Sequence, residues 1–351
     1  MGRDVTVFEA RDVVGGVLMT GIPEYRLPRE ALERDIDYIR STGVKIITDK
    51  RIESLQELRD QGFDAIFLAV GAHKSRKLGV PGEDLAGVHD ALTFLRRVKS
   101  GELNTLTGRV LVVGGGNAAL DAARTALRLG AASVTLLYRR TRDEMPAIRE
   151  DIEEAQIEGI DMRFLFSPVA IEGDSSVSAL RCQEMELGEV DASGRRRPVP
   201  KPDSEVAFEA EHVIVAVGQG PELGFAADDD KLVVHRGWVE VDPVSLRSGA
   251  SDVFAGGDVV TGPATIVQAV GAGQRAAQAI DVFLGGKGEL PPDHGWASPS
   301  KPDEEAASVP RHPIRAVPAQ RRKGNFREVL KGYSLQAACA EARRCLRCDM
   351  E

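Results

Sequence analysis

Long apolar runs are missing from this 351-residue sequence, and no window reaches the length that a membrane-spanning helix needs. The N-terminus also lacks the apolar core of a secretory signal peptide. Acidic residues outnumber basic ones, and the net charge of −9 argues against nucleic acid as the main partner. We therefore expect a cytoplasmic protein that binds neither membranes nor nucleic acids.

Aromatic residues and cysteines are also scarce, at 5% of the chain and 4 residues. Cys182 stands alone and is assigned to packing. Cys339, Cys345 and Cys348 lie close together near the C-terminus, where a reducing compartment favours metal binding over a disulfide framework. Glycine, with 36 residues, is abundant and suits α/β units joined by glycine turns, and the length allows two domains.

The most informative stretch runs from Arg109 to Pro146. An apolar β-branched run stops at three glycines, and an alanine-rich segment with helical spacing and a second apolar run follow. The turn reads GxGxxA through Gly114, Gly116 and Ala119, a pattern that permits a tight turn, close approach of a pyrophosphate and close helix packing. This order of strand, glycine turn, helix and strand predicts a dinucleotide site.

The end of the second strand in this unit indicates which dinucleotide binds. An NAD site usually has an acidic residue there, whereas this chain has Arg139 and Arg140. Two guanidiniums suit a 2′-phosphate, so we favour NADPH over NADH. A solvated basic edge is the alternative interpretation.

A second nucleotide-binding unit is indicated at the N-terminus and in two later strands. The run from Asp4 to Phe8 ends in Glu9, where a carboxylate could bind an adenosine ribose, and glycines follow. Phe63–Gly71 and His212–Gly218 are apolar strands that each end at a glycine, which fits one such strand in each of two related dinucleotide folds. In VFAGGD, Asp258 follows two glycines and could accept hydrogen bonds from a ribityl chain, and an alanine-rich helix follows it.

Several of these segments together resemble the glutamate synthase small-subunit family. The resemblance is carried by VTVFEARDVVGG, GIPEYRLPREAL, GGGNAALDAARTALRLG with YRRTRDEMPA, and VFAGGDVVTGPATIVQAVGAGQRAA, in one order over residues 2 to about 285. Members of this family are NADPH-dependent, FAD-containing iron–sulfur oxidoreductases. The resemblance therefore implies an α/β fold of two Rossmann-like dinucleotide-binding domains, with the NADP domain inserted in the FAD domain.

The implied division is an FAD domain over residues 1–100 and 231–285 and an NAD(P) domain over residues 101–230. A linker or arm follows over residues 286–332, and a partial iron–sulfur segment over residues 333–351. Motif and resemblance together give the candidate cofactor-binding residues Glu9, Gly15, Gly16, Arg26, Gly71, Gly114, Gly115, Gly116, Asn117, Ala119, Arg139, Arg140, Gly218, Gln219, Gly257, Asp258 and Thr265. No catalytic acid, base or nucleophile is assigned, because hydride transfer needs aligned rings and no dedicated proton carrier.

The sequence departs from the family pattern at both ends. The glycine-rich FAD pyrophosphate loop and the iron–sulfur segment expected before it are not found. Either the sequence is part of a longer chain or a partner supplies them. The affinity for FAD depends on this loop, because such a loop binds the pyrophosphate. At the C-terminus, EARRCLRC resembles the family's iron–sulfur segment, so we predict Cys339, Cys345 and Cys348 as metal ligands. A tetrathiolate cluster needs a fourth ligand, from residues absent here or from another polypeptide.

These observations predict an electron-input subunit of a hetero-oligomeric complex, in which electrons pass from NADPH through FAD and iron–sulfur clusters to a partner redox subunit. In the family's best-known members the partner forms glutamate. The alternative within enzymes is the same fold serving another acceptor, such as a ferredoxin, a hydrogenase or formate dehydrogenase complex, or dihydropyrimidine reduction, and the C-terminal position of the CxxC motif is an argument for it. A non-catalytic docking scaffold without FAD is the alternative from another class.

Overall fold

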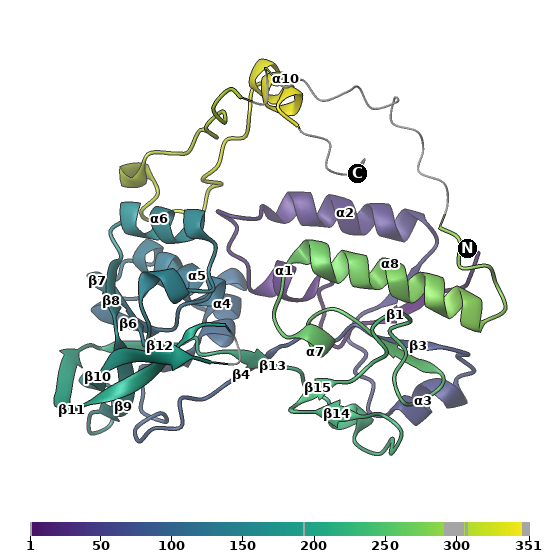
Figure 1. The fold of residues 1–351 in the computed structure, drawn as a ribbon, viewed down its shortest axis with the longest axis horizontal. Coiled ribbons are helices and arrows are strands. Elements are labelled where there is room, and N and C mark those ends of the chain that lie inside the picture. The colour runs from purple at the N-terminus through teal and green to yellow at the C-terminus, as the bar shows by residue number, and fades with distance from the viewer. Residues whose placement is uncertain (1, 192–193, 291–304, 306–307, 346–351) are drawn as a thin grey trace.

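The computed structural model describes residues 2–191, 194–290, 305 and 308–345, which form two lobes and a C-terminal arm (Figure 1). The elements from β5 to β12 form one unit, which we call the central lobe. Elements before β4 and after β13 combine in the other unit, the split lobe, whose purple and green segments lie together in Figure 1. The central lobe is therefore inserted between the two parts of the split lobe.

A five-stranded parallel sheet of order β5-β12-β6-β7-β8 is the centre of the central lobe. Its strands are β5 (Val88–Asp90), β6 (Arg109–Val113), β7 (Ser133–Tyr138), β8 (Asp161–Phe164) and β12 (His212–Val215), and its helices are α4 (Ala91–Lys99), α5 (Asn117–Arg128) and α6 (Arg149–Ile157). The short 3-10 helix η1 (Arg142–Glu144) precedes α6. Because β5 belongs to this sheet, the lobe begins before residue 101, where the sequence division placed the NAD(P) domain.

The apolar strands of this sheet are buried on both faces. Along β6, Val110 and Val112 pack in one core cluster with α4 and α5, while Leu111 and Val113 pack in another. This explains why the strand reads as a continuous apolar run without alternation. Four alanines of α5 are fully buried, so this helix packs closely on the sheet: Ala119, Ala122, Ala123 and Ala126.

An antiparallel sheet of order β11-β10-β9 covers the second face of the parallel sheet. Its strands are β9 (Phe166–Glu172), β10 (Ala179–Val190) and β11 (Arg196–Glu209). This confirms the antiparallel excursion expected between Asp161 and Phe208. Cys182 is fully buried in the core between the two sheets, as its assignment to packing predicts.

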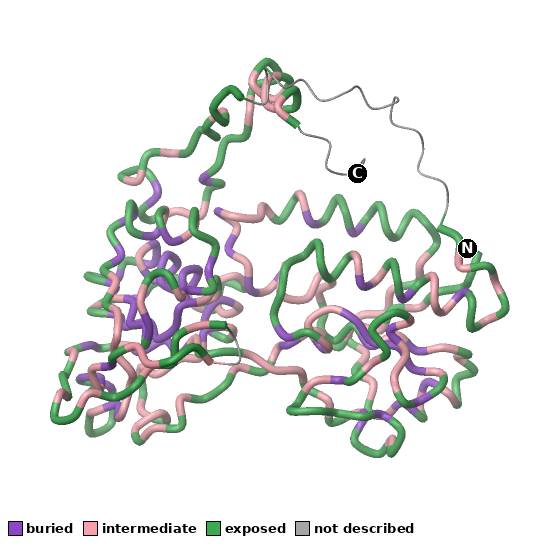
Figure 2. The backbone as a smooth tube through the Cα atoms, in the orientation of Figure 1, coloured by how far each residue is buried: buried purple, intermediate pink, exposed green. Residues whose placement is uncertain are grey.

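The split lobe contains two separate pairs of parallel strands. β1 (Thr6–Phe8) pairs with β2 (Lys45–Ile47), and β16 (Val253–Ala255) pairs with β3 (Ile66–Leu68). The surrounding helices are α1 (Gly16–Thr20), α2 (Arg29–Ser41), α3 (Leu55–Asp60), α7 (Asp258–Thr261) and α8 (Ile266–Phe283), with η2 (Gly224–Ala226) and the hairpin of β14 (Val234–His235) and β15 (Trp238–Val239). Figure 2 shows that burial is densest in the central lobe, whereas α2 and α8 are largely exposed.

Two linkers and the arm complete the molecule. The linkers pair as short antiparallel strands, β4 (Lys74–Ser75) and β13 (Gln219–Gly220). We call residues 308–345 the arm; it includes η3 (Ala319–Arg321) and α10 (Leu335–Arg343). Ser334 caps α10 as expected, since its hydroxyl accepts a hydrogen bond from the amide of Ala337. Among the described residues, no helix combines the length and apolar character needed to cross a membrane.

Candidate functional site

The glycine turn between β6 and α5 has one position that is open toward a ligand. A β-carbon on Gly114 would lie 2.4 Å from the carbonyl oxygen of Ala216, and one on Gly115 would lie 2.5 Å from the ring of Tyr138. A β-carbon on Gly116 would meet its nearest neighbour, in Pro146, at 4.0 Å. The first two glycines are therefore required by internal packing, whereas the third leaves space beside the backbone.

Backbone amides at the start of α5 provide the binding groups of this turn. Gly116 is the N-cap and offers no side-chain cap, and in the described part of the chain the amides of Gly116, Asn117 and Ala118 have no hydrogen-bond partner. Ala119 is fully buried beneath the turn. Free amides at the positive end of a helix dipole bind phosphate groups, so the turn has the donors that a pyrophosphate needs.

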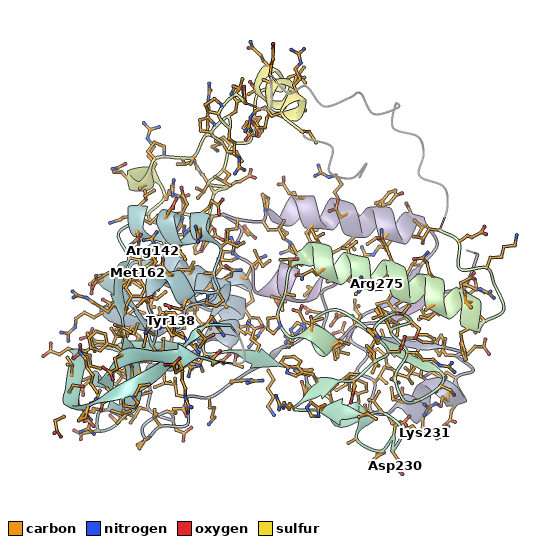
Figure 3. The ribbon with its side chains drawn as sticks, viewed as in Figure 1. Tyr138, Arg142, Met162, Asp230, Lys231 and Arg275 are labelled. Atoms are coloured by element: carbon orange, nitrogen blue, oxygen red, sulfur yellow. The ribbon has the colours of Figure 1, made fainter. Side chains whose placement is uncertain are left out.

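A loop from the far end of β7 packs against this turn. The side-chain oxygen of Asn117 accepts a hydrogen bond of 3.0 Å from the amide of Ile148, and the amide of Ala147 donates to the carbonyl of Gly115 at 3.3 Å. The hydroxyl of Tyr138 donates to the carbonyl of Glu144 at 2.9 Å. Figure 3 labels Tyr138 in the central lobe. The side chain of Asn117 thus positions the loop, and the backbone amide of Asn117 remains free to bind a ligand.

The two arginines at the end of β7 have different environments. Arg139 is exposed and has no hydrogen-bond or ion-pair partner within the described residues. Arg140 is only 4% exposed; its guanidinium donates to the carbonyl of Arg196 at 2.7 Å and pairs with Asp191 at 2.6 Å. This placement differs from the expectation that both guanidiniums face a 2′-phosphate, because Arg140 is occupied in holding the β10–β11 hairpin.

In the split lobe, predicted cofactor residues gather around His73. A β-carbon on Gly16 would lie 3.7 Å from Nε2 of His73, and one on Gly71 would lie 3.4 Å from the same atom. Burial is the main cause that lowers the pKa of His73, Arg11 lowers it further, and Glu9 and Asp258 act in the opposite direction. Gly16, Gly71 and the carboxylates of Glu9 and Asp258 therefore lie near one another around His73. The sequence reasoning missed His73, whose only signal was its position two residues after Gly71.

Asp258 begins α7 directly after a glycine in the left-handed region, Gly257, with a φ of 74°. Burial raises the pKa of Asp258, while the amide of Ala264 donates to its carboxylate at 3.1 Å and acts in the opposite direction. Its neighbour Gly256 packs so closely under α8 that a β-carbon would lie 3.1 Å from Ala272. The carboxylate is thus held at the strand end, as an acceptor for ribityl hydroxyls requires.

The N-terminus of α8 is closed by its own cap. The hydroxyl of Thr265 accepts a hydrogen bond of 3.3 Å from the amide of Gln268, whose side chain in turn accepts from the amide of Thr265 at 3.0 Å. Thr265 thus orients the helix, and its hydroxyl is occupied by this capping box. The predicted helix from Thr265 to Ile280 is confirmed, with the observed end at Phe283.

Taken together, these residues fit a dinucleotide such as FAD. Glu9 is half-buried at the end of β1, and its carboxylate accepts a hydrogen bond of 2.9 Å from the amide of Arg11. Gly15 caps α1 with a φ of 115°, and a β-carbon there would lie 3.2 Å from Leu32. A carboxylate at the end of β1, glycine turns and Asp258 at the start of α7 are groups of the kind that such a cofactor uses.

Three other predicted positions lie at the junction of the two lobes. Gly218, with a φ of 128°, accepts a hydrogen bond of 2.9 Å from the amide of Arg76, and Gln219 pairs with Ser75 in the linker strands. Arg26 pairs with Asp121 at 2.8 Å, which differs from the expectation that its guanidinium binds a cofactor. Gly218 and Gln219 thus lie at the linker between the two lobes, whereas the guanidinium of Arg26 forms an ion pair within the chain.

The cysteine-rich end is described only in part. Cys339 lies in α10 and Cys345 follows it, both exposed and free, while Cys348 lies outside the described residues. Within the described ranges, no group of three or more histidine, cysteine or acidic side chains is arranged to hold a metal ion. Two thiols are too few for a tetrathiolate cluster, so we derive no electron step through this segment.

The two cavities that we describe lie away from all of these groups. One, of about 420 Å³, lies by α3, next to Arg59, Asp229 and Asp252. The other, of about 190 Å³, lies between Pro23, Lys99 and Phe326. Neither is lined by a predicted cofactor-binding residue, so we base the site on the glycine turns and strand ends.

Fold and site together define a class, the oxidoreductases that hold two dinucleotides in two Rossmann-like domains. The chain belongs to the pyridine nucleotide-disulphide oxidoreductase family, which matches residues 2–273. Membership confirms the predicted fold class, the oxidoreductase class, and FAD and NADPH as the cofactors of the fold.

Several known proteins are similar to this chain. It is 41% identical to the NADP(+)-dependent formate dehydrogenase subunit beta of Moorella thermoacetica, over 99% of this chain and 51% of that protein. It is 40% identical to the NADPH-Fe(3+) oxidoreductase subunit beta of Geobacter sulfurreducens, over 99% and 58%. The chain thus spans about half the length of these relatives.

Two further comparisons bear on the family and on the fold. The glutamate synthase [NADPH] small chain of Halomonas elongata is 36% identical over 81% of this chain and 63% of that protein, which confirms the predicted resemblance. Mycobacterium tuberculosis FprA, solved in complex with NADPH, superposes with a TM-score of 0.66 at 19% identity, over 80% of this chain and 78% of that one. At this identity the superposition shows a shared fold.

Proposed function

We propose that this chain is the NADPH-oxidising, electron-input part of a larger redox enzyme. NADPH would bind at the turn from Gly114 to Ala119, and FAD between Glu9 and Asp258. Electrons would leave for a partner redox subunit in a hetero-oligomeric complex. The cytoplasm is the compartment that we expect for it.

One observation carries this proposal, the open space beside Gly116. The neighbouring Gly114 and Gly115 are each closed by the protein's own atoms, so the requirement for glycine there is structural. At Gly116 no internal neighbour explains the missing side chain, and free amides surround it. A pyrophosphate lying against the backbone explains both features.

Residues of the chain would bind and orient the reactants and would carry no proton. Bound FAD supplies the ability to accept a hydride and to release electrons singly, which no amino-acid side chain provides. Arg139 is exposed at the end of β7 and would bind the 2′-phosphate of NADPH. Asp258 would fix the ribityl chain, and the linker residues Gly218 and Gln219 would border the nicotinamide. We assign no catalytic histidine, serine or carboxylate.

The extent of the similarity favours one group of acceptors. The formate dehydrogenase and Fe(3+) oxidoreductase subunits match 99% of this chain, whereas the glutamate synthase small chain matches 81%. We therefore place an acceptor complex of the first kind before a glutamate-forming partner. Ferredoxin and dihydropyrimidine reduction remain alternatives. An iron–sulfur cluster at Cys339, Cys345 and Cys348, completed by a further ligand, stays a prediction.

Reconstitution with FAD tests the proposal. The purified chain mixed with FAD should turn yellow, and the colour should bleach when NADPH is added without oxygen. Gly116→Ala should weaken NADPH binding at least tenfold, because the new methyl group fills the space of the pyrophosphate. Gly224→Ala is the matched control, since its β-carbon also meets nothing within 4 Å. A protein that stays colourless with FAD would support the docking scaffold instead.

A further inference from the structure

A cluster of charged side chains lies where three segments meet. Its ion pairs join four guanidiniums to four carboxylates, so the charges balance: Arg26, Arg124, Arg128 and Arg322 with Asp121, Asp151, Glu154 and Glu158. The segments are helices α5 and α6 of the central lobe, the arm, and residues 21–28 of the split lobe, which we call the strap. Buried charges are tolerated when they are paired in this way.

The strap enters the cluster through Tyr25 and Arg26. The guanidinium of Arg26 donates to both oxygens of Asp121, at 2.9 and 2.8 Å, and to Asp151 at 2.9 Å. The ring of Tyr25 is 1% exposed and lies beneath Arg128, whose guanidinium carbon is 3.9 Å from the ring centre. Burial raises the pKa of Tyr25, so its phenol stays neutral in this position.

The arm enters the same cluster from the other side. Arg322 is 4% exposed and donates to Glu154 and, at 3.0 Å, to Glu158. The arm also contacts the strap itself, because the amide of Val329 donates to the carbonyl of Tyr25 at 3.0 Å. The ring of Phe326 lies 6.4 Å from that of Tyr25. The arm therefore touches both lobes at one place (Figure 1).

The position of the cluster restricts how the two lobes can rotate relative to each other. The chain connects the lobes through the two linkers that pair as β4 and β13, and two adjacent linkers leave rotation about their common axis free. The strap makes a further contact between the lobes. This contact is reinforced by Lys99 of α4, whose ammonium donates to the carbonyls of Leu18 and Ile22 at 3.1 and 2.7 Å. Rotation would separate Arg26 from both of its carboxylates and leave buried charges unpaired.

We propose that the strap and the arm form a clamp that fixes the angle between the two lobes, with Arg322 as a positioning residue for hydride transfer. The proposal rests on the proposed function, because two rings must be aligned for that transfer. Arg322 touches neither cofactor position; it holds Glu154 and Glu158, and through α5 and α6 it holds Arg26 and Tyr25.

Two measurements on Arg322→Ala test the clamp. A pair of fluorophores, introduced through non-canonical amino acids at exposed Tyr38 on α2 and Arg163 on β8, reports the distance between the lobes. We expect a single narrow distance in the unsubstituted protein and a broad distribution in the variant. In stopped-flow mixing of the FAD-loaded protein with NADPH, the limiting rate of bleaching should fall at least tenfold while the Kd for NADPH changes less than twofold.

Controls separate the clamp from other causes. Arg321→Ala removes the exposed neighbouring cation and should change neither measurement, and Arg322→Lys should recover part of the bleaching rate. If Arg322→Ala does not fold, Glu154→Gln removes one of its partners and replaces it in the test. A narrow distance and an unchanged limiting rate in the variant would overturn the clamp. Failure of the unsubstituted protein to bleach would overturn the proposed function, and the distance measurement would still decide the clamp.

Discussion

The ring of Tyr138 packs against the backbone of Gly115, so closely that a β-carbon there would lie 2.5 Å from the ring. The hydroxyl of the same tyrosine donates to the carbonyl of Glu144. Tyr138 thus joins the glycine turn to the loop that follows β7, which is where the adenosine end of a dinucleotide is expected. Gly115 is therefore glycine because of packing within the protein, whereas Gly116 leaves space for a ligand.

This difference predicts opposite effects for two adjacent substitutions. Gly115→Ala should lower the free energy of unfolding by about 1–3 kcal/mol, because the ring or the turn must move to admit the methyl group. Gly116→Ala should change it by less than about 1 kcal/mol, the range for losing a glycine N-cap. Chemical denaturation of both variants checks this, with Gly224→Ala as control. Equal destabilisation by the two substitutions would contradict the assignment.

The two arginines after β7 should likewise give different effects when each is replaced by alanine. Arg139→Ala should weaken NADPH binding about tenfold and leave NADH binding nearly unchanged, because a charged hydrogen bond to the 2′-phosphate is lost. Arg140→Ala should instead lower the free energy of unfolding by about 1–3 kcal/mol, since it removes buried hydrogen bonds to the hairpin. Titration with both nucleotides and denaturation measure these effects. Similar losses for NADPH and NADH in Arg139→Ala would remove the cofactor preference.

The local features of the site were predictable from the sequence because they depend on neighbouring residues. The turn at Gly114, the cap at Thr265 and the buried strand β16 each follow from a short pattern of glycines, capping residues or apolar residues. Family resemblance added the order of the two lobes. These parts of the prediction hold because backbone geometry sets them.

The partners of long charged side chains were not predictable in the same way. Arg26 and Asp121 are 95 residues apart in sequence, and Arg140 and Asp191 are 51 apart. A guanidinium reaches whichever carboxylate the tertiary structure places nearby, so a basic residue next to a cofactor motif does not have to face the cofactor. Arg322, in a segment predicted to be a linker, became buried for the same reason.

The C-terminal cysteines give a third prediction, on metal content. Cys345→Ser should reduce the iron bound after anaerobic reconstitution with iron and sulfide, and it should leave bleaching of bound FAD by NADPH nearly unchanged. Cys182→Ala is the matched control, because that thiol is buried and burial raises its pKa to about 12, so it does not act as a ligand. Elemental analysis gives the iron content. Unchanged iron in Cys345→Ser would exclude the ligand role.

Glu158 gives a fourth prediction, on stability against pH. Burial acts to raise the pKa of Glu158, but hydrogen bonds from Arg128 and Arg124 outweigh it and hold the pKa at about 2, against 4.5 for the free side chain. A carboxyl whose pKa is lower in the folded protein stabilises the fold above its unfolded pKa. Each pKa unit is worth about 1.4 kcal/mol, so this carboxylate contributes about 3 kcal/mol near neutral pH.

That contribution should be lost as the pH falls from about 4.5 to 2. Below this window the carboxyl of Glu158 is protonated in both the folded and the unfolded protein, so folding no longer releases its proton. Glu158→Gln removes the titration, so the difference in unfolding free energy between the two proteins should be largest near neutral pH and shrink in this window. Exposed Glu33, which pairs with Arg29 on the surface of α2, gives the control: Glu33→Gln should leave the profile nearly unchanged. Denaturation curves at several pH values measure both differences. A difference for Glu158→Gln that stays constant from pH 7 to pH 2 would show that its carboxylate is not held by the arginines, and the centre of the clamp would then have to lie elsewhere.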